Sequence, residues 1–522
     1  MSSIASVFID KHTTSSTPDL HILYAVEVGL DDGTKYEVLR RYSEFAALHD
    51  ALGDPYSLPP KNSVFNAIIP SAWVDDELIA ERKDGLLAYL NSLLRSSRYK
   101  ASSKLLAFLN PNYITDVHGF DDEITPSMIC KANLAIKAPI SRLASPVAAA
   151  YYPDWSAWSN PPGKVDFSKF DILFFAFVVP NSSSTINWDD GSQDTLRDLV
   201  SAARQSGRGT RIVLSIGGWG GSYWFSNSMS NATNRTKLVN ALVGAVNSFG
   251  LDGIDIDWEY PNSPGSGNPY SWADAANFLS FLKSLRAALG WSKIISGAVA
   301  HHPWLGPNGA PLSNVSDYAA QMSYINIMNY DVNGASANPG PNAPLGNPCG
   351  SSSQPEANAQ AALSQWQKAG FPASKMLLGL ALYGYVSKST ATRLSNSYVP
   401  ASDPHEHAPL IERADAVASD LSQWWGSQVA FKQLVSAGAL KKQADGTYNG
   451  ANGFTKGWDD CSDTPFLYNT AKTTVVSYDD TDSLADKAKF AKQSGMAGCF
   501  TWSLDQDDGY SLQSVVRSNL GK

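Results

Sequence analysis

The chain has 522 residues, 43% of them hydrophobic, with 15 Trp and a formal net charge of −9. This length predicts more than one domain, and the hydrophobic content suffices for a large buried core. The negative charge excludes nucleic acid as the main partner, because nucleic-acid binding usually needs a basic surface. The four cysteines lack metal-ligand spacing, so the sequence predicts no metal and no cofactor, while Cys349 and Cys461 are candidates for one disulfide.

The first 112 residues form the first predicted domain. Short strand patterns (HILYAVEV, KYEVLRRY) alternate there with helical ones (SEFAALHDAL, DDELIAERKDGLLAYLNSLL). Residues 113–147 have no sustained helix or strand period, so we expect a linker. No apolar stretch in the chain reaches the length of a transmembrane helix.

Three segments of this first domain resemble the phox-homology family of phosphoinositide-binding domains. They are LRRYSEFAALHDAL at 39–52, LPPK at 58–61 and ERKDGLLAYLNSLL at 81–94. The resemblance implies an α+β fold and, as a partner, membranes that carry phosphatidylinositol 3-phosphate. Arg41 would pair with the 3-phosphate and Tyr42 would stack beneath the inositol ring. Lys61 and Arg82 would reach the other phosphate positions, since Arg and Lys both bind phosphate oxygens.

After residue 147, strand-like apolar runs alternate with helical segments, which indicates parallel β/α units. Counting YYPDW at 151–155 as the first strand gives eight strand candidates, the number that closes a (β/α)8 barrel. We assign residues 148–520 to this α/β barrel. The long gap at about 386–474, between the seventh and eighth strands, predicts an α+β insertion.

The stretch LDGIDIDWEY at 251–260 carries the candidate catalytic groups. Asp255, Asp257 and Glu259 alternate with apolar residues, so in a strand all three share one face. Like charges so close cannot all ionise, which raises at least one pKa and keeps a proton in place. A carboxylic acid that is protonated near neutral pH is what general acid catalysis requires.

The same stretch resembles the DxxDxDxE signature of family 18 glycoside hydrolases, the chitinases. SIGGW at 215–219, MNYD at 328–331 and GLALYG at 379–384 resemble further motifs of that family, in the right order. Matching segments continue at 458–466 and 478–505. The resemblance implies cleavage of β-1,4-linked N-acetylglucosamine polymers with retention, in which the substrate's own N-acetyl group is the nucleophile.

The resemblance also implies roles for single residues. Glu259 would protonate the leaving oxygen, Asp257 would orient the acetamido group, and Asp255 would share a proton with Asp257. Tyr330 would donate to the acetamido oxygen, and Asp331 would bind the distorted sugar. The remaining implied sugar contacts are Tyr152, Trp219, Met328, Tyr383 and Trp502. Aromatic rings suit pyranose rings because both present flat apolar faces.

Alternatives stay open at this point. Many relatives place an Arg where this chain has Tyr385, which affects subsite preference and leaves the chemistry in place. An endo-N-acetylglucosaminidase shares the fold and the chemistry. A non-catalytic chitin-binding or endosomal adaptor protein is disfavoured by the intact acids. The N-terminus lacks a secretory signal pattern, so we expect a cytoplasmic or endosomal-membrane location, or an extracellular one if the two-domain chain is a gene-model fusion.

Overall fold

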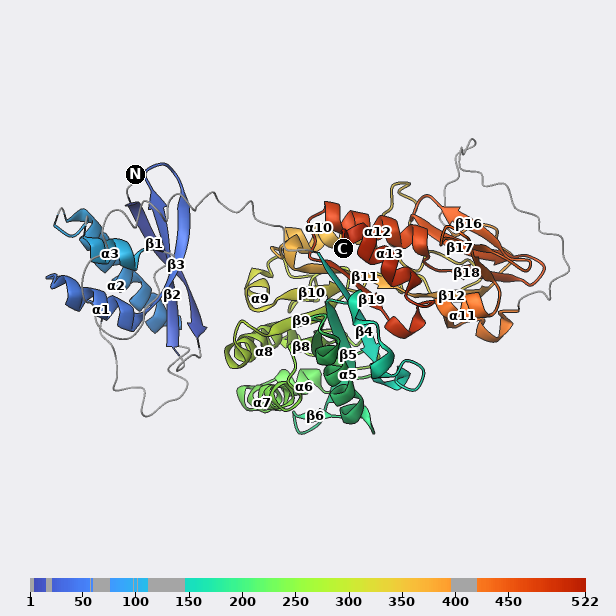
Figure 1. Cartoon of the computed structure of the whole chain (residues 1–522), viewed down its shortest axis with the longest axis horizontal. Coiled ribbons are helices and arrows are strands. Elements are labelled where there is room, and N and C mark those ends of the chain that lie inside the picture. The colour runs from blue at the N-terminus through green and yellow to red at the C-terminus, as the bar shows by residue number, and fades with distance from the viewer. Residues whose placement is uncertain are drawn as a thin grey trace. The chain divides into compact units, whose positions relative to one another are not determined.

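The computed structural model describes residues 4–15, 21–56, 58–59, 76–96, 98–100, 102–110, 146–395 and 420–522. The chain forms two compact units, residues 1–140 and 141–522 (Figure 1). Residues 113–145 of the predicted linker lie outside the described residues. Among the described residues, every helix is too short or too polar to cross a bilayer.

The described residues of the first unit form a three-stranded antiparallel sheet and three helices. Its strands, in sheet order, are β1 (Ile4–Ser15), β2 (His21–Leu30) and β3 (Lys35–Arg41). Its helices are α1 (Tyr42–Leu52), α2 (Asp76–Arg95) and α3 (Ser103–Phe108). The core includes Tyr24, Phe45 and Phe108, and the ring of Phe45 meets the other two edge-on. The unit therefore has the α+β character that the sequence predicts.

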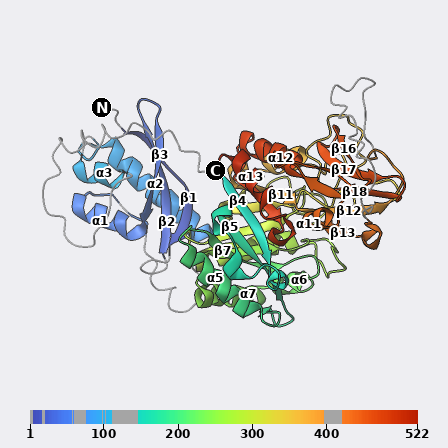
Figure 2. The same ribbon diagram turned by 45° about the vertical axis from the view of Figure 1, so that its right-hand side comes forward.

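Eight parallel strands close the second unit into a barrel. They run in the order β4–β19–β11–β10–β9–β8–β7–β5, and β5 pairs with β4 to complete the circle. Their bounds are β4 (Val147–Pro153), β5 (Ile172–Pro180), β7 (Arg211–Gly217), β8 (Gly253–Asp257), β9 (Ile294–Val299), β10 (Tyr324–Ile327), β11 (Met376–Ala381) and β19 (Gly498–Trp502). Figure 2 shows β4, β5 and β7 side by side. The predicted (β/α)8 barrel is confirmed.

Helices surround the barrel strands. They are α5 (Ser192–Ser206), α6 (Phe225–Met229), α7 (Ala232–Phe249), α8 (Asp274–Leu289), α9 (Ser316–Gln321), α10 (Ala359–Lys368), α12 (Thr481–Gln493) and α13 (Ser511–Leu520); the short strand β6 (Ile186–Asn187) pairs with β5. Capping fixes the ends of α7, where the Asn231 side chain accepts from Asn234 N and Gly250 follows with φ 65°. With both faces of the strands covered, continuous apolar runs such as ILFFAFVV are the expected strand sequence.

The insertion between β11 and β19 is a second, antiparallel sheet. Its order is β13–β12–β18–β17–β16, and its bounds are β12 (Tyr383–Lys388), β13 (Gln428–Ala430), β16 (Thr455–Asp459), β17 (Thr464–Asn469) and β18 (Thr474–Ser477). It also carries α11 (Phe431–Ser436) and the hairpin β14 (Leu440–Lys442) with β15 (Tyr448–Gly450). A disulfide joins Cys349, in the segment after β10, to Cys461 between β16 and β17. The insertion is therefore cross-linked to a barrel loop.

Candidate active site

The three acidic side chains lie at the carboxyl end of β8, where barrel enzymes place their catalytic groups. Asp255 and Asp257 belong to the strand, and Glu259 follows two residues beyond its last residue. The alternating residues Ile256 and Trp258 pack into the hydrophobic core between strands and helices. The period-two pattern therefore separates an apolar face from an acidic face that looks into the barrel.

Asp255 is fully buried and accepts hydrogen bonds from four barrel strands. Its Oδ2 accepts from Tyr151 Oη at 2.8 Å and from Ser215 Oγ at 2.7 Å. Its Oδ1 accepts from Ser296 Oγ at 2.7 Å and from Asn326 Nδ2 at 3.1 Å. Burial raises the pKa of Asp255, and the three hydroxyl donors oppose that rise. The donors make Asp255 a fixed anchor at the centre of the barrel.

Asp257 and Glu259 form a closely coupled acid pair. Burial, followed by the charges of Glu259 and Asp255, raises the pKa of Asp257 well above its ordinary value. Burial also raises the pKa of Glu259 to about 7; the charge of Asp331 adds to that rise, whereas hydrogen bonds with Tyr260 and Asp257 oppose it. One oxygen of Asp257, Oδ1, is buried without a hydrogen-bond partner among the described residues. Near neutral pH this pair can hold a proton beside an unused acceptor.

The raised pKa of Glu259 predicts a pH-dependent stability that needs no substrate to observe. The folded protein keeps the proton up to about pH 7, whereas the unfolded chain releases it near 4.5. Stability therefore falls as the pH rises through this window. We expect Glu259→Gln, which cannot ionise, to raise the melting temperature relative to wild type more at pH 8 than at pH 4. An equal difference at both pH values would contradict the raised pKa.

The backbone around Glu259 is fixed by the neighbouring loops. Glu259 N donates to Ser222 Oγ at 3.0 Å, and Asn268 Nδ2 donates to Glu259 O at 3.1 Å. Gly217 pairs with Asp257 across β7 and β8 and has φ 114°, and a Cβ there would lie 2.1 Å from Asp257 O. The SIGGW motif therefore combines a packing role at Gly217 with a polar role at Ser215, which binds Asp255.

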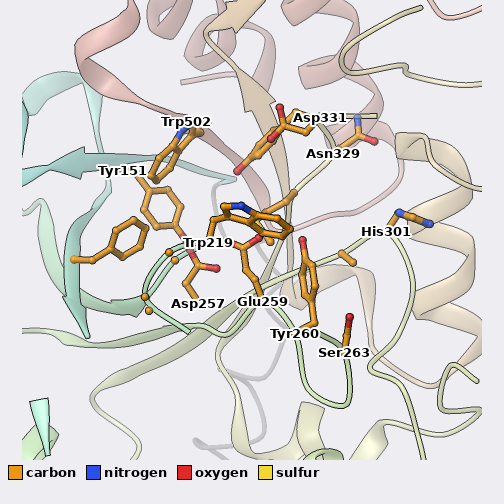
Figure 3. A pocket seen from close by; sticks show the side chains of 18 of the residues that line it. Tyr151, Trp219, Asp257, Glu259, Tyr260, Ser263, His301, Asn329, Asp331 and Trp502 are labelled. Atoms are coloured by element: carbon orange, nitrogen blue, oxygen red, sulfur yellow. The ribbon is translucent and has the colours of Figure 1, made fainter. Parts of the chain in front are cut away.

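Aromatic rings form one side of the site (Figure 3). Trp502, the last residue of β19, stacks on Phe177 with ring centroids 5.8 Å apart and an interplanar angle of 24°. Tyr151 meets Trp502 edge-on at 5.2 Å, and Trp155 lies 6.5 Å from it. These packed neighbours hold the indole of Trp502 in place beside the acids.

The site opens into a cleft of about 1120 Å³. Trp219, which is 56% exposed, and Met328 line it, as the sequence predicts for sugar contacts. On the side away from Trp502, Tyr260, Ser263 and His301 line the cleft (Figure 3). The cleft therefore has an aromatic side and a more polar side, with Glu259 between them.

The position of Tyr152 disagrees with its predicted sugar contact. Tyr152 is fully buried in the outer core, stacks on Phe175 and donates to Asn160 O at 2.7 Å. Strand β4 begins at Val147, before the YYPDW segment, and consecutive strand residues face opposite sides. Tyr151 therefore lines the cleft and Tyr152 faces away.

A matched pair of variants tests this correction. Tyr151→Phe removes one of the four donors to buried Asp255, so we expect kcat to fall about tenfold. Tyr152→Phe removes only the bond to Asn160 O, and we expect kcat to stay within about twofold of wild type. The measurement is steady-state kinetics on a soluble oligosaccharide of the class that the sequence resemblance implies. The reverse ranking of the two variants would contradict the assignment.

Tyr383 lies behind Asp331 rather than on the cleft. Tyr383 is buried, its ring packs edge-on against Tyr330, and its hydroxyl donates to Asp331 Oδ1 at 2.6 Å. Tyr330 and Asp331 themselves line the cleft. Tyr383, a predicted sugar contact, therefore does not line the cleft and instead bonds to a residue that does. Tyr385, two residues further along β12 and linked to subsite preference in the sequence analysis, does line the cleft.

The described residues of the first unit bear on two of its four predicted lipid contacts. Arg41 ends β3 at the start of α1, and its backbone N–H donates to Glu44 Oε2 at 2.7 Å. The Tyr42 hydroxyl donates to the carbonyl of Pro59, so the turn at 58–59 lies against the start of α1. Lys61 lies outside the described residues, as does the side chain of Arg82 in α2.

A (β/α)8 barrel with an acid pair at the end of β8 and an aromatic-sided cleft defines this protein as a glycoside hydrolase. The family model of glycosyl hydrolases family 18 matches residues 147–507, and the chain belongs to that family. The PX domain model matches residues 29–112. No cluster that could hold a metal ion occurs in the part of the chain that the structure describes.

Relatives and solved structures agree with this assignment. The chain is 34% identical over 418 residues to a chitinase-like effector of Moniliophthora roreri, covering 76% of this chain and 98% of the relative. It is 28% identical over 383 residues to Chitinase B of Serratia marcescens, covering 64% of this chain and 72% of the relative. A crystal structure of a chitinase from Rhizomucor miehei matches with a TM-score of 0.60 and 31% identity, covering 72% of this chain and 99% of that one.

Proposed function

We propose that the second unit is a chitinase that cleaves β-1,4-linked N-acetylglucosamine polymers with retention of configuration. The observation that carries the proposal is the Asp257–Glu259 pair. Glu259 has a pKa of about 7, and the neighbouring Asp257 has a buried oxygen with no partner among the described residues. Glu259 can protonate a glycosidic oxygen, and Asp257 Oδ1 can accept a hydrogen bond from an amide N–H. An N-acetylglucosamine polymer offers both groups. The relatives that are named chitinases support this substrate class.

In the proposed first step, Glu259 donates its proton to the glycosidic oxygen as the C–O bond breaks. The carbonyl oxygen of the substrate's N-acetyl group attacks the anomeric carbon and forms an oxazolinium ion. Asp257 accepts the amide N–H and stabilises the positive charge, and Tyr330 donates to the acetamido oxygen. In the second step water attacks the anomeric carbon while the Glu259 carboxylate takes its proton, the bond from that carbon to the acetamido oxygen breaks, and the product keeps the original configuration.

The sugar contacts of this proposal are Trp502, Trp219, Met328 and Asp331, all of which line the cleft. Trp502 supports the distorted sugar, because its indole is held by Phe177 and Tyr151. Asp255 contributes as the anchored charge beneath Asp257; the two share no hydrogen bond among the described residues, so proton exchange between them stays a prediction.

The test is hydrolysis of a chromogenic chitotrioside by the full-length protein, with Glu259→Gln as the paired control. Release that disappears in the variant supports the proposal. No release from folded wild-type protein, together with oligosaccharide binding in calorimetry, would overturn the proposed hydrolysis and indicate a binding protein. This outcome is of interest because two relatives are named chitinase-like effectors. Cleavage of a glycoprotein glycan without cleavage of the trioside would indicate an endo-N-acetylglucosaminidase.

We propose separately that the first unit binds phosphoinositide headgroups, with phosphatidylinositol 3-phosphate membranes as the partner. The match of the PX domain model to residues 29–112 supports this proposal. So does the bond from Tyr42 to Pro59, which brings the proline turn next to Arg41. We assign Arg41, Tyr42, Lys61 and Arg82 to the headgroup.

The test is sedimentation with phosphatidylcholine vesicles that contain 5% phosphatidylinositol 3-phosphate, compared with vesicles without it. We expect Arg41→Ala to lose the lipid-dependent fraction. Arg98→Ala is the matched control, because Arg98 carries the same charge and its guanidinium lies over the Tyr99 ring. Equal binding to both kinds of vesicle, or equal loss in both variants, would overturn the proposal.

A further inference from the structure

Asp331 is held by a cluster of neutral hydrogen-bond donors that we call the Asp331 clamp: Tyr383, Tyr385 and Gln428. All three bond to the same oxygen, Oδ1. Tyr383 Oη lies at 2.6 Å, Tyr385 Oη at 2.7 Å and Gln428 Nε2 at 3.3 Å. Gln428 Nε2 also donates to Tyr385 Oη at 2.9 Å. The other carboxylate oxygen, Oδ2, has no hydrogen-bond partner among the described residues.

The clamp belongs to the insertion, whereas Asp331 belongs to the barrel. Tyr383 and Tyr385 lie on β12 and Gln428 on β13, which pair with each other. The barrel segment after β10 is bonded to the same sheet: Asn342 Nδ2 donates to Tyr383 O, and Asn342 Oδ1 accepts from Asp331 N. The backbone of Asp331 and its side chain are thus both set by the position of the insertion.

The clamp leaves the charge of Asp331 uncompensated. Within the described part of the chain, Asp331 forms no salt bridge, and no Lys or Arg lines the cleft. Tyrosine hydroxyls and a glutamine amide orient a carboxylate without cancelling its charge, unlike a guanidinium. The titratable acids and histidines around Glu259 are Asp189, Asp255, Asp257, His301, His302 and Asp331.

From this geometry we infer that Tyr385 and Gln428 are positioning residues for the hydrolase reaction: they fix the orientation of the Asp331 carboxylate so that its Oδ2 is directed to the sugar beside Glu259. This inference rests on the proposed function and adds the insertion to the catalytic unit. Consistent with it, the Asp331 charge raises the pKa of Glu259. The insertion therefore influences the reaction through the side chain of Asp331, in addition to lining one side of the cleft.

The inference predicts a change in the pH profile. Hydrolysis requires protonated Glu259, so kcat falls as the pH rises through its pKa of about 7. The double variant Tyr385→Phe/Gln428→Leu removes two of three donors, and Asp331 can then turn away from the cleft. We expect the basic limb of kcat to move about 0.5 pH unit lower, because a nearby negative charge is lost, and KM to rise about tenfold.

A second variant separates charge from position. Gln428→Lys places an ammonium beside Asp331 while both tyrosines still hold it. We expect the basic limb to move lower as well, with KM within about threefold of wild type. Gln443→Leu is the matched control: Gln443 is an exposed glutamine of the same insertion, and among the described residues its Nε2 donates to Lys441 O alone. Its melting temperature, KM and pH profile should match those of wild type.

The outcomes distinguish this inference from the proposed function. A double variant that keeps the wild-type basic limb and KM, at an unchanged melting temperature, would overturn the inference while leaving the chitinase proposal intact. If the wild type has no turnover, the proposed function fails, and the clamp is then tested by calorimetry with chitotriose. In that case a tenfold loss of affinity in the double variant supports the positioning role, and equal affinity overturns it.

Discussion

Glu259→Gln is expected to lower kcat on a soluble chito-oligosaccharide by about 10³, within the range that a positioned general acid supplies. The amide keeps the shape of the side chain and can still donate a hydrogen bond, but it has no proton to give to the leaving oxygen. The Kd for chitotriose should stay within about threefold of wild type, because the proposed sugar contacts in the cleft are unchanged. Steady-state kinetics and calorimetry measure the two quantities.

Asp189→Asn is a suitable comparison for this variant, since Asp189 also lines the cleft but lies on another loop, between β6 and α5. We expect its kcat to fall far less than that of Glu259→Gln. A loss of only a few-fold in Glu259→Gln, or an equal loss in both variants, would remove Glu259 from the role of acid.

Gly217→Ala is expected to destabilise the barrel by about 3 kcal/mol and to abolish most activity. The new Cβ would lie 2.1 Å from Asp257 O and 2.6 Å from the Phe225 ring, and φ 114° disfavours any side chain. Relief requires β7 and β8 to separate at the residue pair that carries Asp257. The free energy of unfolding in urea measures the effect.

The control for this variant is Gly220→Ala, three residues further along the chain in the loop that follows β7. A Cβ there meets no atom within 4 Å, so we expect a change in unfolding free energy below about 0.5 kcal/mol. If both alanine variants were equally stable, the close approach at Gly217 would not constrain the strands.

The barrel could be predicted from sequence because parallel strands covered on both faces are rich in apolar residues, as in ILFFAFVV of β5, and because eight strand candidates alternate with helical segments. The acids of β8 were visible for a related reason: charges that alternate inside a buried strand have no structural explanation as simple as a catalytic one. Local patterns of this kind can be interpreted from the sequence, because the alternation of side chains follows from the geometry of a single strand.

What could not be predicted depends on strand ends and on distant contacts. Tyr152 was assigned as a sugar contact from the family resemblance, and consecutive strand residues face opposite sides, so an assignment that is off by one residue exchanges the cleft-lining Tyr151 for a buried side chain. The sequence also gives no sign that Gln428 meets Asp331, 97 residues away, because that contact requires the sheet order of the insertion. Interactions between distant segments therefore had to come from the structure.

The disulfide between Cys349 and Cys461 depends on the redox state of the compartment in which the protein resides. Structural disulfides persist in oxidising compartments and are rare in the reducing cytosol, where phosphoinositide-binding domains meet their membranes. The redox state of these two cysteines in protein isolated from its native cells therefore reports which compartment the protein occupies. An intact disulfide would indicate that the protein passes through an oxidising compartment. Two free thiols would indicate that it stays in the cytosol, and the insertion would then lack its covalent link to the barrel loop.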